Sequence, residues 1–185
     1  IKQIYLTSQD CSVYEYEGIN LKDLVERIVN LDYKFFLRIG MINPRLLLDN
    51  FDQIISILKL PKVYKLLHLP LQSGSDDILQ KMNRPYRISK IIDKLDYLRK
   101  TFPQLTLSTD IICGFPGESE YDFLQTVNFI KWLKPEILNI SKFTPRPGTK
   151  AKKMVQLDSS TIKDRSLRLS NVFRTLLENM NQDWL

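Results

Sequence analysis

The chain has 185 residues, 43% of them hydrophobic and 10% aromatic, which is enough for one substantial core but short for two ordinary domains. It has no apolar run near the length of about 20 residues that crosses a bilayer, and no signal-peptide pattern, so we expect a cytoplasmic protein that binds no membrane. The net charge of +6 favours a polyanionic partner such as RNA, although basic residues spread along the chain also suit a plain solvated surface.

Five apolar segments with the character of strands alternate with helical segments, as in a parallel sheet with crossover helices. The predicted strands are residues 2–8, 34–39, 65–71, 105–113 and 137–143. The predicted helices are residues 20–30, 45–58, 75–82, 89–101, 119–134 and 159 to about 180. Ser75 and Ser119, each followed by acidic residues, are the expected N-caps of two of them. Because the first residues already have the pattern of a strand, we expect a fragment of a longer protein.

Polar side chains recur at alternate positions of the predicted strands, and alternate positions share one face. These residues are Gln9, Arg38, His68, Gln72, Asp110, Asn139 and Ser141. Placing so many polar groups inside a fold is costly unless they bind a polar ligand, water or one another. A closed barrel fills its interior with branched aliphatic residues. The pattern therefore favours an α/β fold of the open, partial TIM-like barrel type, with the lumen as the active site.

Three segments that follow predicted strands carry candidate binding groups. In LPLQSGSD, Gly74 permits close backbone approach, and the hydroxyls of Ser73 and Ser75 suit an anion or ribose, or simply a capped helix. TDIICGFPGESE contains an exposed glycine-rich bend whose strand-end carbonyls suit an adenine amino group, or only a tight turn. NISKFTPRPGT holds Arg146 between two prolines, where it suits a carboxylate or phosphate. The first two segments are expected to meet at the carboxyl rim of the strands.

The cysteines and the single histidine give weaker signals. Cys11 and Cys113 form no CxxC pair, so neither a disulfide framework nor a metal site is predicted. His68 is more typical of a satisfied interior residue than of a general acid or base.

The combination of TSQD, LRIGMINP, HLPLQSGSD, MNRPY, TDIICGFPGE and PRPGT resembles, in order and spacing, the radical S-adenosylmethionine (SAM) domain of the methylthiotransferases. LRIGMINP resembles the archaeal and eukaryotic branch, which adds a methylthio group to threonylcarbamoyladenosine beside the tRNA anticodon. The resemblance implies a transferase that uses SAM and 4Fe-4S clusters and acts on tRNA. Action on an aspartate of a ribosomal protein, and a non-catalytic RNA-binding scaffold, are the alternatives.

The same resemblance implies a domain organisation. Residues 1–158 would form a partial radical SAM barrel whose first strand is missing, and residues 159–185 a helix leading toward an RNA-binding domain. The family's CxxxCxxC segment, which holds the SAM-cleaving cluster, has no counterpart in this sequence. We therefore expect no metal ligand and no catalytic residue, and the chain alone should be inactive. The barrel edge left unpaired by the missing strand favours self-association.

The resemblance also assigns binding residues, position by position. The implied cofactor-binding residues are Gln9, Arg38, Gln72, Ser73, Asp110, Ile112 and Gly114. Of these, Gln72 and Ser73 would lie near the SAM ribose, and Ile112 and Gly114 near its adenine. The others would line the lumen near the methionine portion of SAM or the substrate. The implied substrate-binding residues are Arg84 and Arg146.

Overall fold

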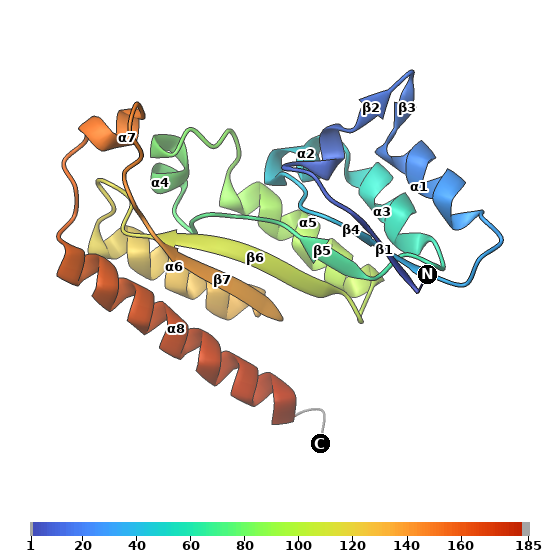
Figure 1. Cartoon of the computed structure of the whole chain (residues 1–185). Helices are drawn as coiled ribbons and strands as arrows, with labels where there is room; N and C mark the ends of the chain where they lie inside the picture. The colour runs from blue at the N-terminus through green and yellow to red at the C-terminus, as the bar shows by residue number, and fades with distance from the viewer. Residues whose placement is uncertain (1, 183–185) are drawn as a thin grey trace. The chain divides into compact units, whose positions relative to one another are not determined.

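The computed structural model describes residues 2–182, which divide into two compact units (Figure 1). Unit 1 comprises residues up to 70 together with residues 89–108. Unit 2 comprises residues 71–88 and the chain from residue 109 onward. Among the described residues, no helix combines the length and apolar character that crossing a bilayer requires.

Unit 1 is built on parallel strands. β1 (Gln3–Leu6) pairs in parallel with β4 (Phe36–Ile39), with Gln3 opposite Phe36. Bridges from Leu37 to Val63 and from Met41 to His68 connect β4 to the segment that carries β5 (Leu66–His68). β5 in turn pairs in parallel with the first residues of β6 (Thr106–Cys113). The predicted α/β class with parallel strands is therefore confirmed, and the described strands form open sheets.

Four helices lie wholly or almost wholly in unit 1. They are α1 (Leu21–Val29), α2 (Pro44–Asp49), α3 (Phe51–Lys59) and α5 (Ile88–Thr101), of which only Ile88 belongs to unit 2. Leu37 and Ile39 of β4 are buried, whereas Phe36, the first residue of the strand, is exposed. This alternation is the two-residue period expected of a strand with one covered face.

Unit 1 also contains features that the sequence pattern did not predict. A short 3-10 helix, η1 (Cys11–Val13), precedes a hairpin of β2 (Glu15–Tyr16) and β3 (Ile19–Asn20). Each hairpin strand has two residues, too few for a periodic pattern. The single helix predicted over residues 45–58 is broken at Asn50, whose φ of −122° and ψ of 36° leave the helical region.

Unit 2 places helices against the remainder of β6 and its neighbour β7 (Ile137–Lys142). Its helices are α4 (Asp76–Lys81), α6 (Glu120–Leu133), α7 (Lys150–Lys153) and α8 (Ser159–Gln182). The predicted serine caps are confirmed: the Ser75 hydroxyl accepts from the Ile78 amide and the Ser119 hydroxyl from the Asp122 amide. α8 packs on α6 and β7 within the same unit. The predicted domain boundary after residue 158 stays a prediction.

Candidate functional site

A pocket of about 740 Å³ in unit 2 gathers most of the residues predicted to bind ligands. Five of them line it: Gln72, Arg84, Asp110, Ile112 and Arg146. Asn139 and Ser141, which share their predicted strand face, line it as well. The pocket thus combines the carboxyl end of β6, the inner positions of β7 and the two loops that follow Gln72 and β7.

The backbone of Gln72 is fixed at this pocket in an unusual conformation. Its φ is +68°, in the left-handed region that non-glycine residues rarely adopt. Two hydrogen bonds hold it against β6, one from its amide to the Asp110 carbonyl at 2.8 Å and one from the Ile112 amide to its carbonyl at 2.9 Å. Strained residues of this kind persist where the surrounding structure over-determines them, and they cluster at binding sites.

Polar and apolar groups alternate along the pocket floor. The Asp110 carboxylate accepts a hydrogen bond of 2.7 Å from the Asn139 amide group across β6 and β7. Ile112, two residues farther on the same face, supplies an apolar wall. Phe143 extends that wall: its amide donates to the Cys113 carbonyl at 2.8 Å, and its ring meets that of Phe115 edge-on at 5.1 Å. Sequence reasoning missed Phe143, although it lies in the segment that contains Arg146.

The rim of the pocket is basic. Arg84, Lys142 and Arg146 line it and are exposed, and none of their charged groups forms an ion pair with another described residue. The loop that carries Arg146 is held by its backbone carbonyl, which accepts from the Thr149 hydroxyl at 2.8 Å. Arginines in a pocket whose lining contains one carboxylate suit a carboxylate or phosphate ligand.

Ser73 lies away from the pocket, packed against α6. It is 1% exposed, and its hydroxyl shares a hydrogen bond of 3.2 Å with the Thr126 hydroxyl. The neighbouring Gly74 permits a close approach, but to α6: an added Cβ would lie 2.6 Å from Thr126 Cα. Ser73 and Gly74 therefore pack against α6 in this structure. Contact of Ser73 with a ribose stays a prediction.

Gly114 packs closely against α8. Its φ is +80°, and an added Cβ would lie 2.5 Å from Ile162 Cγ1. Its amide donates to Glu118 Oε2 at 3.0 Å, and the same oxygen accepts from Arg165 Nη1 at 2.7 Å. Burial raises the pKa of Glu118, and hydrogen bonds from Gly114 and Arg165 act against that rise. Sequence reasoning missed Glu118 and Arg165, because 47 residues separate them.

Gln9 and Arg38 belong to unit 1 and are therefore described apart from the pocket. Gln9 is exposed. The Arg38 guanidinium lies 5.7 Å from the centre of the Tyr5 ring, its partner in the register of β1 and β4. Their assignment to cofactor binding stays a prediction.

The described residues do not fit an iron–sulfur cluster. Within residues 2–182, no group of three His, Cys, Asp or Glu side chains is arranged to hold a metal. Cys11 and Cys113 are buried free thiols in different units. Burial, together with the nearby Glu118, raises the pKa of the Cys113 thiol to about 12. Several cysteine thiolates hold an iron–sulfur cluster, and the described residues contain only these two cysteines.

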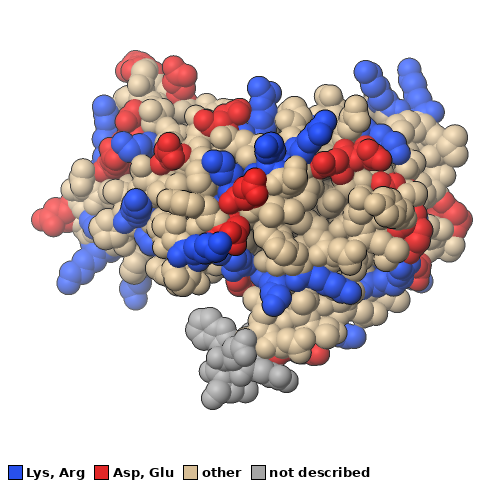
Figure 2. Space-filling view, turned by 180° about the vertical axis from the view of Figure 1, so that it is seen from behind, with Lys and Arg blue, Asp and Glu red and all other residues tan. Residues whose placement is uncertain are grey.

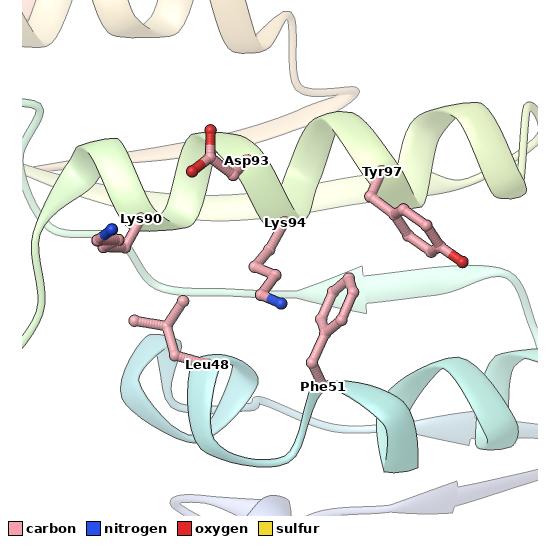
Figure 3. Close-up of a pocket in the computed structure, with 6 residues that line it drawn as sticks. All are labelled: Leu48, Phe51, Lys90, Asp93, Lys94 and Tyr97. Atoms are coloured by element: carbon pink, nitrogen blue, oxygen red, sulfur yellow. The ribbon is translucent and has the colours of Figure 1, made fainter.

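Another hollow is a weaker candidate for a ligand site. This hollow, in unit 1, has a volume of about 510 Å³. Figure 3 shows its lining, in which Phe51 of α3 faces Lys94 and Tyr97 of α5. The Lys94 ammonium lies 4.2 Å from the centre of the Phe51 ring, so side chains of the hollow already pair with one another. On the face seen in Figure 2, basic side chains are interspersed with acidic ones, so charge does not single out a site on that face.

An open α/β fold with parallel strands and a polar pocket at their carboxyl ends defines a class of proteins that bind small ligands at that rim. Within that class, the chain belongs to the radical SAM superfamily, whose sequence model matches residues 1–130.

Comparisons with individual proteins agree with this membership. The chain is 40% identical, over all of its 185 residues, to a protein of Pyrococcus horikoshii named probable threonylcarbamoyladenosine tRNA methylthiotransferase, and covers 44% of it. It is 41% identical over 175 residues to the human threonylcarbamoyladenosine tRNA methylthiotransferase, covering 94% of this chain and 30% of the human one. The chain thus spans less than half the length of these relatives.

A solved structure supports the fold. Coproporphyrinogen III oxidase of Escherichia coli, a radical SAM enzyme, superposes with a TM-score of 0.70 at 18% identity, covering 95% of this chain and 40% of the oxidase. At that identity the likeness concerns the fold alone. It confirms the predicted radical SAM type of α/β architecture.

Proposed function

We propose that this chain is the SAM-binding part of a cytoplasmic tRNA methylthiotransferase that inserts a methylthio group into threonylcarbamoyladenosine. The observation that carries the proposal is the pocket of unit 2, which is lined by five residues assigned to ligand binding from their motifs. The names of the archaeal and human relatives favour tRNA over a ribosomal protein as the substrate.

The residues of the pocket suggest a division of roles. Ile112 and Phe143 form an apolar wall suited to an adenine, and Gln72, which lines the same pocket, would lie near the ribose. Arg84 and Arg146 would hold an anionic group, either the carboxylate of SAM or a tRNA phosphate. SAM, together with an iron–sulfur cluster, would supply the reactive chemistry, whereas the share of these residues is binding and orientation.

The proposal is tested by titrating the 185-residue chain with SAM and following the ligand by NMR. We expect weak binding that is lowered about tenfold by Arg146→Ala, the loss of one charge-assisted hydrogen bond. Ile112→Asp should abolish it, because a carboxylate would replace the apolar wall. Arg174→Ala on α8 is the matched control, since Arg174 does not line the pocket. Equal affinity of all four proteins, or no binding at the highest SAM concentration of the titration, contradicts the proposal.

The reaction itself is tested in a protein of the relatives' length. After anaerobic loading with iron and sulfide, it should convert threonylcarbamoyladenosine in tRNA to its methylthio derivative, detected by mass spectrometry of the digested RNA. Modification of a ribosomal protein in place of tRNA would contradict the assigned substrate. A protein that folds at that length and takes up no iron would contradict the hypothesis of an enzyme and favour an RNA-binding scaffold.

A further inference from the structure

Unit 1 contains a second hollow, of about 660 Å³, at the amino-terminal ends of β1 and β4. We call its lining the aromatic–lysine surface, and define it by three rings and three lysines: Tyr33, Phe36, Tyr64, Lys2, Lys34 and Lys62. The lining contains no Asp or Glu. None of these residues belongs to the motifs that defined the pocket of unit 2.

Two rings of this surface are mostly exposed, and one of them is in contact with the third ring. Tyr33 is 73% and Phe36 52% exposed. Phe36 alternates with buried Leu37 along β4, so it lies on the exposed face of the strand. Its ring centre lies 5.2 Å from that of Tyr64, whose hydroxyl accepts a hydrogen bond of 2.7 Å from the Gln3 side chain. Two of the rings therefore form a fixed platform.

The lysines surround this platform with positive charge. Lys62 is oriented by its own contacts: its ammonium donates to the Leu31 carbonyl at 2.6 Å and lies 4.7 Å from the centre of the Phe35 ring. Lys2 and Lys34 are exposed and form no ion pair with the described residues. Single exposed aromatic residues are normal on protein surfaces, whereas a group of them marks a candidate interaction site. Here two exposed rings, Tyr33 and Phe36, lie in one hollow with a third, half-buried ring and three lysines.

We propose that the aromatic–lysine surface binds single-stranded RNA, with bases stacked on Tyr33 and Phe36 and phosphates paired with the lysines. Nonspecific single-strand binding sites combine these two groups, because every base has a π-face and every nucleotide a phosphate. A purely apolar partner would leave the lysines uncompensated, and a purely anionic one would not use the rings. The interaction involves residues of unit 1 only and needs neither SAM nor a cluster.

The test is fluorescence anisotropy of a labelled eight-nucleotide oligoadenylate with the 185-residue chain at about 50 mM salt. We expect Tyr33→Ala and Phe36→Ala each to weaken binding about tenfold, since stacking of one base contributes about 1–3 kcal/mol. Lys34→Gln should lower the slope of log affinity against log salt by about 0.7, the share of one phosphate contact on a single strand.

Two control variants use residues of the same kind in unit 2. Tyr121→Ala removes a ring that is 71% exposed on α6, and Lys150→Gln a lysine of α7. Both should bind like the unaltered chain. The proposal is overturned if no oligonucleotide binds, if the control variants weaken binding as much as the Tyr33 and Phe36 variants, or if duplex RNA binds as tightly as the single strand. Because the assay contains no SAM, its failure leaves the test of the proposed function intact.

Discussion

Arg165 of α8 and Glu118 of the GFPGE turn form a buried ion pair, with Nη1 2.7 Å from Oε2 and side chains 6% and 2% exposed. The same Nη1 donates to the Glu118 backbone carbonyl at 2.9 Å. The Glu118 carboxylate also accepts a hydrogen bond from the Gly114 amide, so the ion pair is connected to the backbone of the turn. Helix α8 thereby fixes the turn that follows Ile112, and the wall of the pocket depends on a helix outside its lining.

Breaking this pair should strongly destabilise the protein. Arg165→Met is expected to lower the free energy of unfolding by about 3–5 kcal/mol, because it leaves the Glu118 carboxylate buried and uncompensated. Urea denaturation measures the loss. Arg168→Met is the matched control, since Arg168 is 41% exposed and its pair with Glu120 should contribute about 1 kcal/mol or less. Similar losses in the two variants would show that the buried pair contributes no more to the free energy of unfolding than the exposed pair.

Asp122 should make stability depend on acid. Burial alone would raise the pKa of its carboxyl, but hydrogen bonds from Ser119 and Ser75 outweigh burial and hold the pKa below the ordinary value of 3.8. Its stabilisation is therefore present above about pH 4 and lost as the pH falls through the lowered folded-state pKa. Asp122→Asn should cost about 1–3 kcal/mol at pH 7 and progressively less below pH 4. Thermal unfolding across that range checks the convergence, with Asp164→Asn, at an exposed carboxylate, as the control.

The Cys113 thiol should resist alkylation in the folded protein. With a pKa of about 12, roughly one molecule in ten thousand carries the thiolate at pH 8, and the thiol is also 1% exposed. We expect iodoacetamide to modify it at least about a thousandfold more slowly than in urea, as measured by peptide mass spectrometry. Rapid labelling under native conditions would mean that the end of β6 opens freely.

Gln72 offers a test of strain at the pocket. Gln72→Gly removes the Cβ that makes a φ of +68° unfavourable, which offsets the greater freedom of glycine in the unfolded chain. Stability should therefore stay within about 1 kcal/mol, while SAM binding falls because the turn loosens. Glu17→Gly, at a φ of +49° in the β2–β3 turn, is a control that should leave SAM binding unchanged. A large loss of stability in Gln72→Gly would show that Gln72 stabilises the fold, contrary to this prediction.

Much of this arrangement could be predicted from the two-residue period of the strands. That period placed Gln72, Asp110 and Asn139 on one face, and they line one pocket. It could not show that Ser73 packs against α6 or that Gly114 packs against α8, because these contacts join residues 53 and 48 positions apart in the sequence. The hairpin over residues 15–20 escaped prediction for the opposite reason, since it is too short to carry a period.

The distance between Glu118 and Arg165 along the chain has a consequence for biosynthesis. Since Arg165 is translated 47 residues after Glu118, a nascent chain completes β6, its turn and α6 before the partner of the buried carboxylate exists. During that interval the carboxylate must stay hydrated or protonated, because a buried charge without a partner is unfavourable. The pocket wall can therefore reach its final form only after α8 has been synthesised and has docked.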